Sequence, residues 1–366
     1  MSRARAALLA LLAAAALGGC RQPEPLRIGF IAELSGRSAD IGESGRNGFL
    51  LAVEDARQAG LFDERPVEVL VRDVGASPEA TRAAVGELLA AGVVAVVGPM
   101  NSNNVQIVQP LVEAAGVVEI SPTASAMTLH GKDDLLFRIN WTTRDNGRNY
   151  ARHCHRRGLR RVAVAVNDNN RVFAQSWLEE FRSAFVALGG EVVAAPAFDS
   201  TAGSHGGLVG SLLAPRPDGV VIVGNAADSA RIAQQVRKQA PSMPLVAAEW
   251  AGAAQLLELG GRAVEGLMLA QNYNQADTSP RFTRFGEAYR KRFGSAPAYA
   301  SVLSYDAGAA LTGALSRRLA SMPLKDALLR LGPFDGLQQP LRFDRNGDAE
   351  RPAYFLTVRD GRFVPD

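Results

Sequence analysis

Short apolar segments alternate with longer amphipathic segments along most of the chain. Early apolar segments are rich in Val and Ile and are bounded by Gly, Pro or Asp, at residues 26–32, 67–72, 93–97 and 117–120. Between them, Thr81, Val85 and Leu88 recur at helical spacing, and Val105 and Val108 share the face of another helix. Strands that alternate with helices of this length predict a parallel sheet covered on both faces.

A second set of the same kind begins near Arg138. Its expected strands are 162–166, 191–195, 219–223 and 245–248, and its expected helices lie near 146–157, 173–188, 226–239 and 253–259. Two successive sets predict an α/β protein of two doubly wound parallel-sheet lobes. Residues 280–331 are mostly helical, and we expect them to pack back onto the first lobe. The end of the chain, 340–343 and 353–364, is typical of a hairpin and a final strand.

The N-terminus has the pattern of an export signal. Arg3 and Arg5 precede an apolar run at 6–17, and Gly18, Gly19 and Cys20 follow. A basic start, a short apolar core and small residues before a cleavage point are typical of a secretory signal, and the run is too short for a membrane-spanning helix. We expect residues 1–19 to be the signal peptide. The segment also resembles a bacterial lipobox, which implies lipidation at Cys20 and a tether over residues 20–25.

Charge and cysteine content change this picture little. The 366 residues include 40 Lys and Arg against 37 Asp and Glu. Loss of residues 1–19 removes Arg3 and Arg5, which leaves 38 basic and 37 acidic side chains on 347 residues. There is no basic block of the kind that binds nucleic acid. With Cys20 lipidated, Cys154 is the remaining thiol, so we expect no internal disulfide.

The motifs of enzymes and metal sites are absent from the sequence. There is no Gly-x-Gly-x-x-Gly, phosphate-binding loop, Gly-x-Ser-x-Gly or His-Glu-x-x-His motif. His153, Cys154 and His155 are adjacent, whereas ligands on a helix need a spacing of three or four residues to converge. The segment 344–348 lacks the Gly and Glu of a calcium loop. We therefore expect no enzymatic activity, no metal and no cofactor.

Small polar residues follow two neighbouring strands. Residues 98–104 come directly after Val97 and include Asn101 and Ser102, and residues 121–125 follow Ile120. In parallel sheets, ligands bind beyond the carboxyl ends of the strands, where helix N-termini offer free N–H groups to an anion. Helix capping alone would also account for Ser102 or Ser125. Two such clusters on neighbouring strands favour a binding site.

These and other motifs together resemble the periplasmic Leu/Ile/Val-binding proteins, which are type I solute receptors of ABC importers. The matching segments occur in the family's order over nearly all of the mature chain: 34–36, Gly42, 47–48, 97–102, 120–125, 137–138, Asp145, Gly147, 265–266, 305–307, 343–344 and 347–348. The resemblance implies two lobes joined by three crossover segments, near 141–145, 271–275 and 335–339, that close on a ligand. The lobes would comprise 26–141 with 275–336, and 142–274 with 337–366.

The resemblance also implies ligand-binding residues. Ser102, Thr123 and Ser125 match positions that hold the α-carboxylate and amine of an amino acid, and Glu249 matches an acidic residue that receives the ammonium. Asn101 and Asn225 belong to the expected site through their places after strands. Where the family often carries aromatic residues, this chain has Ile41, Val172 or Phe173, and Asn225 with Ala226, so the side-chain pocket is altered. Trp250 is either a replacement wall or a core residue.

We expect an extracytoplasmic, lipid-anchored receptor that binds a small amino-acid-like or carboxylate ligand. By resemblance, its partner is an ABC permease in the inner membrane, its ligands are of the branched-chain amino acid type or related, and it is a monomer. An alternative is that the same fold reports ligand occupancy to a membrane sensor kinase or cyclase. An enzyme is a third alternative, for which the sequence offers no nucleophile or base.

Overall fold

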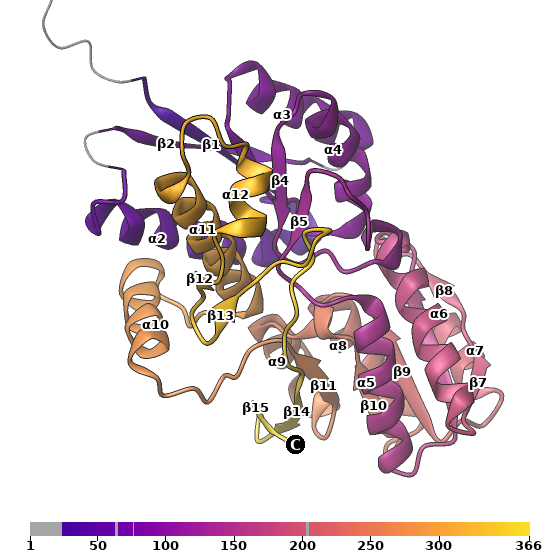
Figure 1. The fold of residues 1–366 in the computed structure, drawn as a ribbon. Coiled ribbons are helices and arrows are strands. Elements are labelled where there is room, and N and C mark those ends of the chain that lie inside the picture. Colours follow the sequence, from indigo (N-terminus) through magenta and orange to yellow (C-terminus); the bar gives the residue numbers. More distant parts are fainter. Residues whose placement is uncertain (1–23, 63–64, 76, 203–204) are drawn as a thin grey trace, which may run out of the picture.

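A computed structural model describes residues 24–366 except 63–64, 76 and 203–204. Two α/β lobes lie side by side, one built from the N-terminal part of the chain and one from its middle (Figure 1). The expected signal peptide, lipidation site and most of the tether lie outside the described residues. No helix within the described part of the chain is long and apolar enough to cross a membrane.

The first lobe contains a parallel sheet. Its strands run in the order β2-β1-β3-β4-β5, with bounds β1 Leu26–Ala32, β2 Val67–Asp73, β3 Ala95–Val97, β4 Val118–Ser121 and β5 Leu136–Arg138. Helices α3 (Pro78–Ala90) and α4 (Ser102–Ala114) cover one face. Helices α2 (Ala39–Gln58), α10 (Pro280–Phe293), α11 (Tyr299–Arg317) and α12 (Leu324–Arg330) pack on the other side. The helical segment 280–331 therefore packs on the first lobe.

The second lobe repeats this strand order. Its parallel strands run β7-β6-β9-β10-β11, with β6 Arg161–Asn167, β7 Glu191–Ala194, β9 Gly219–Val223, β10 Leu245–Ala247 and β11 Met268–Gln271, and β8 (Ala197–Phe198) also pairs with β6. The hairpin β14 (Tyr354–Arg359) and β15 (Arg362–Pro365) extends the sheet antiparallel. Helices α5 (Thr143–Arg156) and α6 (Arg171–Ala187) cover one face, and α7 (Gly206–Leu213), α8 (Ala226–Gln239) and α9 (Ala254–Gly260) the other.

The shared strand order places a switch point in each lobe. In the first lobe it lies between β1 and β3, and in the second between β6 and β9. Helices leave these neighbouring strands in opposite directions, which opens a crevice at their carboxyl ends. The predicted fold class, two doubly wound lobes with crossover connections, is confirmed.

Within the described residues the chain passes between the lobes three times: after β5, after β11 and ahead of β14. The third passage differs from the expected position at 335–339. Strand β12 (Phe334–Asp335) pairs with β13 (Pro340–Leu341), and Leu341, Phe343 and Ala349 are buried in the core of the first lobe. The prediction that 337–349 belong to the second lobe was therefore wrong. Leu341, Phe343 and Ala349 are buried in the core of the first lobe, so the chain crosses to the second lobe only after Ala349.

Arg351 lies in this third passage and ties it to the rest of the connecting region. Its Nε donates to the carbonyl of Ile139, 3.0 Å away, in the first passage. Its guanidinium also pairs with Asp306 of α11, and both side chains are almost fully buried. Asp306 in turn accepts from the backbone N–H of Leu337 at 2.7 Å. A paired and hydrogen-bonded charge of this kind holds the passages together at one place.

Candidate ligand-binding site

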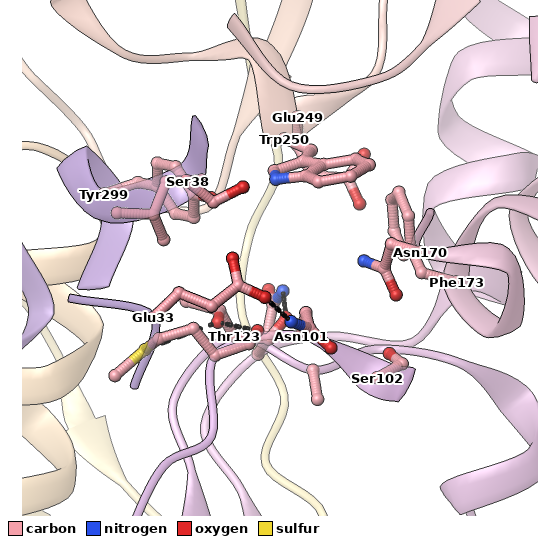
Figure 2. Close-up of a pocket in the computed structure, with 14 residues that line it drawn as sticks. Glu33, Ser38, Asn101, Ser102, Thr123, Asn170, Phe173, Glu249, Trp250 and Tyr299 are labelled. Carbon is pink, nitrogen blue, oxygen red and sulfur yellow. Dashed lines mark hydrogen bonds between the residues drawn. The ribbon is translucent and has the colours of Figure 1, made fainter. Parts of the chain in front are cut away.

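A cavity of about 40 Å³ lies between the two lobes, at the carboxyl ends of their strands (Figure 2). We call it the interlobe cavity. Its polar lining residues are Glu33, Ser38, Asn101, Ser102, Thr123, Asn140, Asn170 and Glu249. Its apolar lining residues are Ile41, Met100, Ala124, Phe173, Trp250 and Tyr299.

The turn between β3 and α4 brings Asn101 and Ser102 to the cavity. Gly98 permits the turn with φ +98°, and a Cβ there would lie 1.9 Å from the carbonyl oxygen of Ile31. Asn101 caps α4, since its side chain accepts from the N–H of Asn104 at 2.8 Å. Ser102 is the first residue of α4 and is 1% exposed. The N-terminus of a helix is suited to a carboxylate.

Thr123 and Ser125 both follow β4, but only Thr123 lines the cavity. Thr123 lines the cavity, its hydroxyl donates to the carbonyl of Met100, and its own carbonyl accepts from Asn140 at 2.8 Å. Ser125 is fully buried behind the lining, and its hydroxyl has no hydrogen-bond partner among the described residues. Its carbonyl accepts from Thr143 of the second lobe at 2.8 Å. The structure thus brings Thr123 to the cavity and Ser125 next to it.

Glu249 enters the cavity from the second lobe, as the second residue after β10. It begins the short helix η3 (Glu249–Ala251) and is 5% exposed. Its two oxygens accept from Asn146 at 2.5 Å and from the indole N–H of Trp177 at 3.2 Å. Burial raises the pKa of this carboxyl from its usual range to about 7, although hydrogen bonds from its own backbone and from Trp177 lower it. Its charge is therefore sensitive to a cation placed beside it.

Trp250 forms a wall of the cavity rather than part of a closed core. Its ring lies across one side of the cavity in Figure 2, and the side chain is half-buried. It packs against the apolar cores of both lobes and meets Phe173 edge to face, with ring centroids 5.7 Å apart. The residue therefore contacts both sides of the space that a ligand would fill.

Glu33 is a lining residue that the sequence analysis missed. It follows β1, and its Oε1 accepts from the side-chain amides of Asn101 and, at 3.3 Å, of Asn104. Helix α2 packs so closely here that a Cβ on Gly42 would lie 1.8 Å from the Glu33 carbonyl oxygen. Burial raises the pKa of the Glu33 carboxyl, against hydrogen bonds from Ser38 and Asn101 that lower it. The cavity thus carries an acidic residue from each lobe.

Asn225 does not line the interlobe cavity. Its side chain caps α8 by accepting from the N–H of Asp228 at 2.8 Å. It lines an adjoining space of about 540 Å³, which we call the side hollow. The side hollow shares Glu33, Ser38, Asn101, Asn170 and Trp250 with the interlobe cavity. Asn225 can reach only a ligand that extends from the cavity into this hollow.

Direct hydrogen bonds join the two lobes near the cavity. The side-chain amide of Asn103, on α4, donates to the carbonyl of Asn169 at 2.8 Å and accepts from the N–H of Val172 at 2.9 Å. The hydroxyl of Ser176, on α6, accepts from the N–H of Met127 at 3.0 Å. These bonds join α4 and the segment after β4 to α6 and the turn that precedes it, so the structure has the lobes drawn together.

Other lining residues have no local signature in the sequence. Ser38, Asn140, Asn170 and Tyr299 reach the cavity from four separate parts of the chain. Of these four, only Asn170 follows an expected strand, β6. Its position after a strand is the sequence feature that would have identified it as a lining residue. Among the described residues, no group of three or more His, Cys, Asp or Glu is placed to hold a metal ion. Cys154 is buried in the second lobe, and burial raises the pKa of its thiol to about 12.

The two lobes bring the polar ends of their strands to a shared cavity, an arrangement typical of solute-binding proteins. Comparison of the sequence with family models identifies the family. The model of the periplasmic binding protein family matches residues 25–362. The chain belongs to this family. The Leu/Ile/Val-binding protein of Escherichia coli K12 is 21% identical over 93% of each chain.

Solved structures are similar over most of the fold. The branched-chain amino acid transporter substrate binding protein LivJ from Streptococcus pneumoniae, in complex with isoleucine, has a TM-score of 0.85 and 23% identity, covering 93% of this chain and 97% of that chain. A solute binding protein from R. palustris in complex with benzoate has a TM-score of 0.83 and 16% identity, covering 93% and 95%. At these identities, the likeness to the solved structures establishes the fold.

Proposed function

We propose that this protein is an extracytoplasmic receptor that binds a small amino-acid-like ligand between its lobes and delivers it to an ABC importer. The observation that carries the proposal is the arrangement of opposite chemistries across the interlobe cavity. Ser102, at the N-terminus of α4, lies on the first lobe, and the carboxyl of Glu249 lies on the second. A zwitterion that bonds to both stabilises the closed arrangement.

The carboxylate end of such a ligand meets hydrogen-bond donors of the first lobe. These are the hydroxyl and the backbone N–H of Ser102, at the positive end of the α4 dipole, because the N–H groups of Asn103, Asn104 and Val105 already bond to Asn170 and Asn101. None of the cavity-lining residues in the described part of the chain is Lys or Arg. An anion would therefore be held by neutral donors and the helix dipole, and the ammonium by Glu249.

The location and partner follow from the family and from the N-terminal sequence. Relatives with this fold bind amino acids or benzoate and include receptors of ABC transporters. We assign residues 1–19 to a signal peptide and a lipid anchor to Cys20, and we propose a monomeric receptor anchored at the outer face of the inner membrane or in the outer membrane. An ABC permease is then the partner that receives the ligand.

The test is a ligand screen combined with solution scattering. The twenty common amino acids and benzoate are first tested for their effect on the thermal unfolding of the purified protein. A ligand at a hundred times its dissociation constant adds about 2.7 kcal/mol to the free energy of unfolding. Titration calorimetry then gives the affinity, and scattering with and without the ligand gives the radius of gyration. Stabilisation by an amino acid together with compaction supports the proposal, and stabilisation without compaction contradicts closure.

A further inference from the structure

The far side of the interlobe cavity is polar and acidic, although the family relatives include receptors for branched-chain amino acids. Glu33 lies there, at the carboxyl end of β1, on the lobe opposite to Glu249. If Glu249 receives the α-ammonium group, Glu33 faces another part of the ligand. The chemistry around Glu33 therefore bears on which ligand side chain the cavity accepts.

Glu33 already accepts hydrogen bonds from Ser38, Asn101 and Asn104, and one of its oxygens still faces the cavity. The side-chain amides of Asn101 and Asn104 both donate to Oε1. The other oxygen points into the cavity, on the side of Ser38 and below the ring of Trp250 (Figure 2). A carboxylate oxygen and the face of an indole ring are both favourable partners for a positively charged nitrogen.

The space beyond Glu33 is also polar. The side hollow continues from the cavity past Glu33 and Asn101 and is lined largely by side-chain amides and hydroxyls, among them Asn103, Asn169 and Thr201. These three side chains already bond to protein groups, but a hydrocarbon side chain in this direction would separate the carboxyl of Glu33 from water without giving it a hydrogen bond in place of water. Such a loss makes a polar site reject an apolar ligand far more strongly than an apolar site rejects a polar one.

We propose that Glu33 selects the ligand, so that the protein binds amino acids whose side chain ends in a nitrogen hydrogen-bond donor in preference to branched-chain amino acids. This inference rests on the proposed function, since it assumes an amino acid in the interlobe cavity. The α-carboxylate lies at Ser102, the α-ammonium group at Glu249, and the terminal nitrogen of the side chain at Glu33. Ammonium, guanidinium and amide groups share the N–H donor that this arrangement requires.

Titration calorimetry of the purified full chain with L-leucine, L-glutamine, L-arginine and L-lysine tests the preference directly. At least one of the three nitrogen-containing ligands is expected to bind on the order of 10- to 100-fold more tightly than leucine, which is the effect of one hydrogen bond to a charged group. Equal or tighter binding of leucine overturns the inference while leaving the proposed function in place. If none of the four binds, both the inference and the proposed amino-acid receptor are rejected.

Two substitutions at Glu33 separate charge from shape. Glu33→Gln keeps the size and removes the charge, so a cationic ligand is expected to lose on the order of tenfold or more in affinity and glutamine much less. Glu33→Leu is expected to abolish or reverse the preference over leucine. Glu43→Gln is the matched control, because Glu43 is exposed on α2 and does not line the interlobe cavity. Unchanged selectivity in both Glu33 variants, with thermal unfolding as in the parent, overturns the inference.

Discussion

Substitution of Glu249 by Gln separates a binding role from a structural one. The side chain is 5% exposed, and its oxygens accept from Asn146 and Trp177. Gln keeps the shape of this group and removes its charge. We expect Glu249→Gln to reduce the affinity for an amino acid by about 2–5 kcal/mol, as for the loss of one partner of a buried charge pair. Ser102→Ala is expected to cost less, about 1–3 kcal/mol, because the backbone N–H of residue 102 and the dipole of α4 remain.

The pKa of Glu249 makes the binding dependent on pH. With the folded pKa raised to about 7, about half of the free protein is protonated there at neutral pH. Because an ammonium group binds the ionised form, the affinity rises with pH and levels off above the pKa. Between pH 6 and pH 8 the expected gain is about tenfold. Binding near pH 7 also releases about half a proton, which calorimetry in buffers of different ionisation enthalpy measures.

Stability without ligand changes in the opposite direction. The folded pKa of Glu249 lies above the unfolded value of 4.5, so the folded state favours the protonated form. The contribution of Glu249 to the free energy of unfolding is therefore most favourable below about pH 4.5 and is lost as the pH rises toward 7. Glu249→Gln removes this loss, and we expect a more stable ligand-free protein at pH 8, by up to about 3 kcal/mol.

Titration calorimetry at pH 6, 7 and 8 measures the affinity of the parent and of Glu249→Gln. Urea unfolding at the same pH values measures their free energies of unfolding. Glu258→Gln is the control, because it makes the same change at an exposed position on α9 outside the interlobe cavity. We expect the control to bind and unfold like the parent. A parent protein whose affinity is independent of pH, or a Glu249→Gln variant that binds as tightly as the parent, would refute the ammonium role.

Three further substitutions test other parts of the structure. Asn103→Ala removes two hydrogen bonds between the lobes and should weaken ligand binding by about 1–3 kcal/mol, mainly through faster dissociation seen by stopped flow; unchanged kinetics would exclude a closing role. Glu119→Leu replaces a fully buried carboxyl on β4 whose pKa burial raises and whose oxygens have no partner among the described residues. It should raise the free energy of unfolding by at least about 1 kcal/mol at pH 8 and by less at pH 5, and equal destabilisation at both would contradict this. Cys20→Ser should leave the protein in the wash from lysed cells, whereas retention of a cleaved protein in the membranes would rule out a lipid anchor there.

Much of the fold follows from local sequence. The bounds of β1 and β9 agree with prediction because strands buried on both faces of a parallel sheet read as continuous apolar runs. Helix α8 agrees as well, since Asn225 caps its first turn. Helix α5 begins three residues before the predicted position, because Thr142 and Asp145 form a capping box ahead of it.

Elements without a local signal were missed. Helix α7 lies in a segment with three Gly residues, which weakens any helical pattern, and β5 has only three residues. The third passage between the lobes was misplaced because Leu341 and Phe343 look like part of the final hairpin. Only their burial against the first lobe distinguishes them.

The sequence predicts those residues of the candidate site that follow strands. It does not predict residues whose place in the cavity depends on contacts between the lobes. Ser102, Thr123 and Glu249 follow expected strands and do line the cavity. Glu33 also follows a strand, but an acidic residue at the end of an apolar run is usually exposed. Its place in the cavity depends on Asn101 from another turn and on Trp250 from the other lobe, which no local pattern reveals.

The central claim is that the two lobes enclose an amino acid. Native mass spectrometry of the protein purified from its own host without unfolding measures the bound molecule directly. The account predicts a one-to-one complex whose released ligand carries both an amino and a carboxyl group, and loss of that ligand from the Glu249→Gln variant. A bound molecule without an amine, retained equally by the variant, would contradict it.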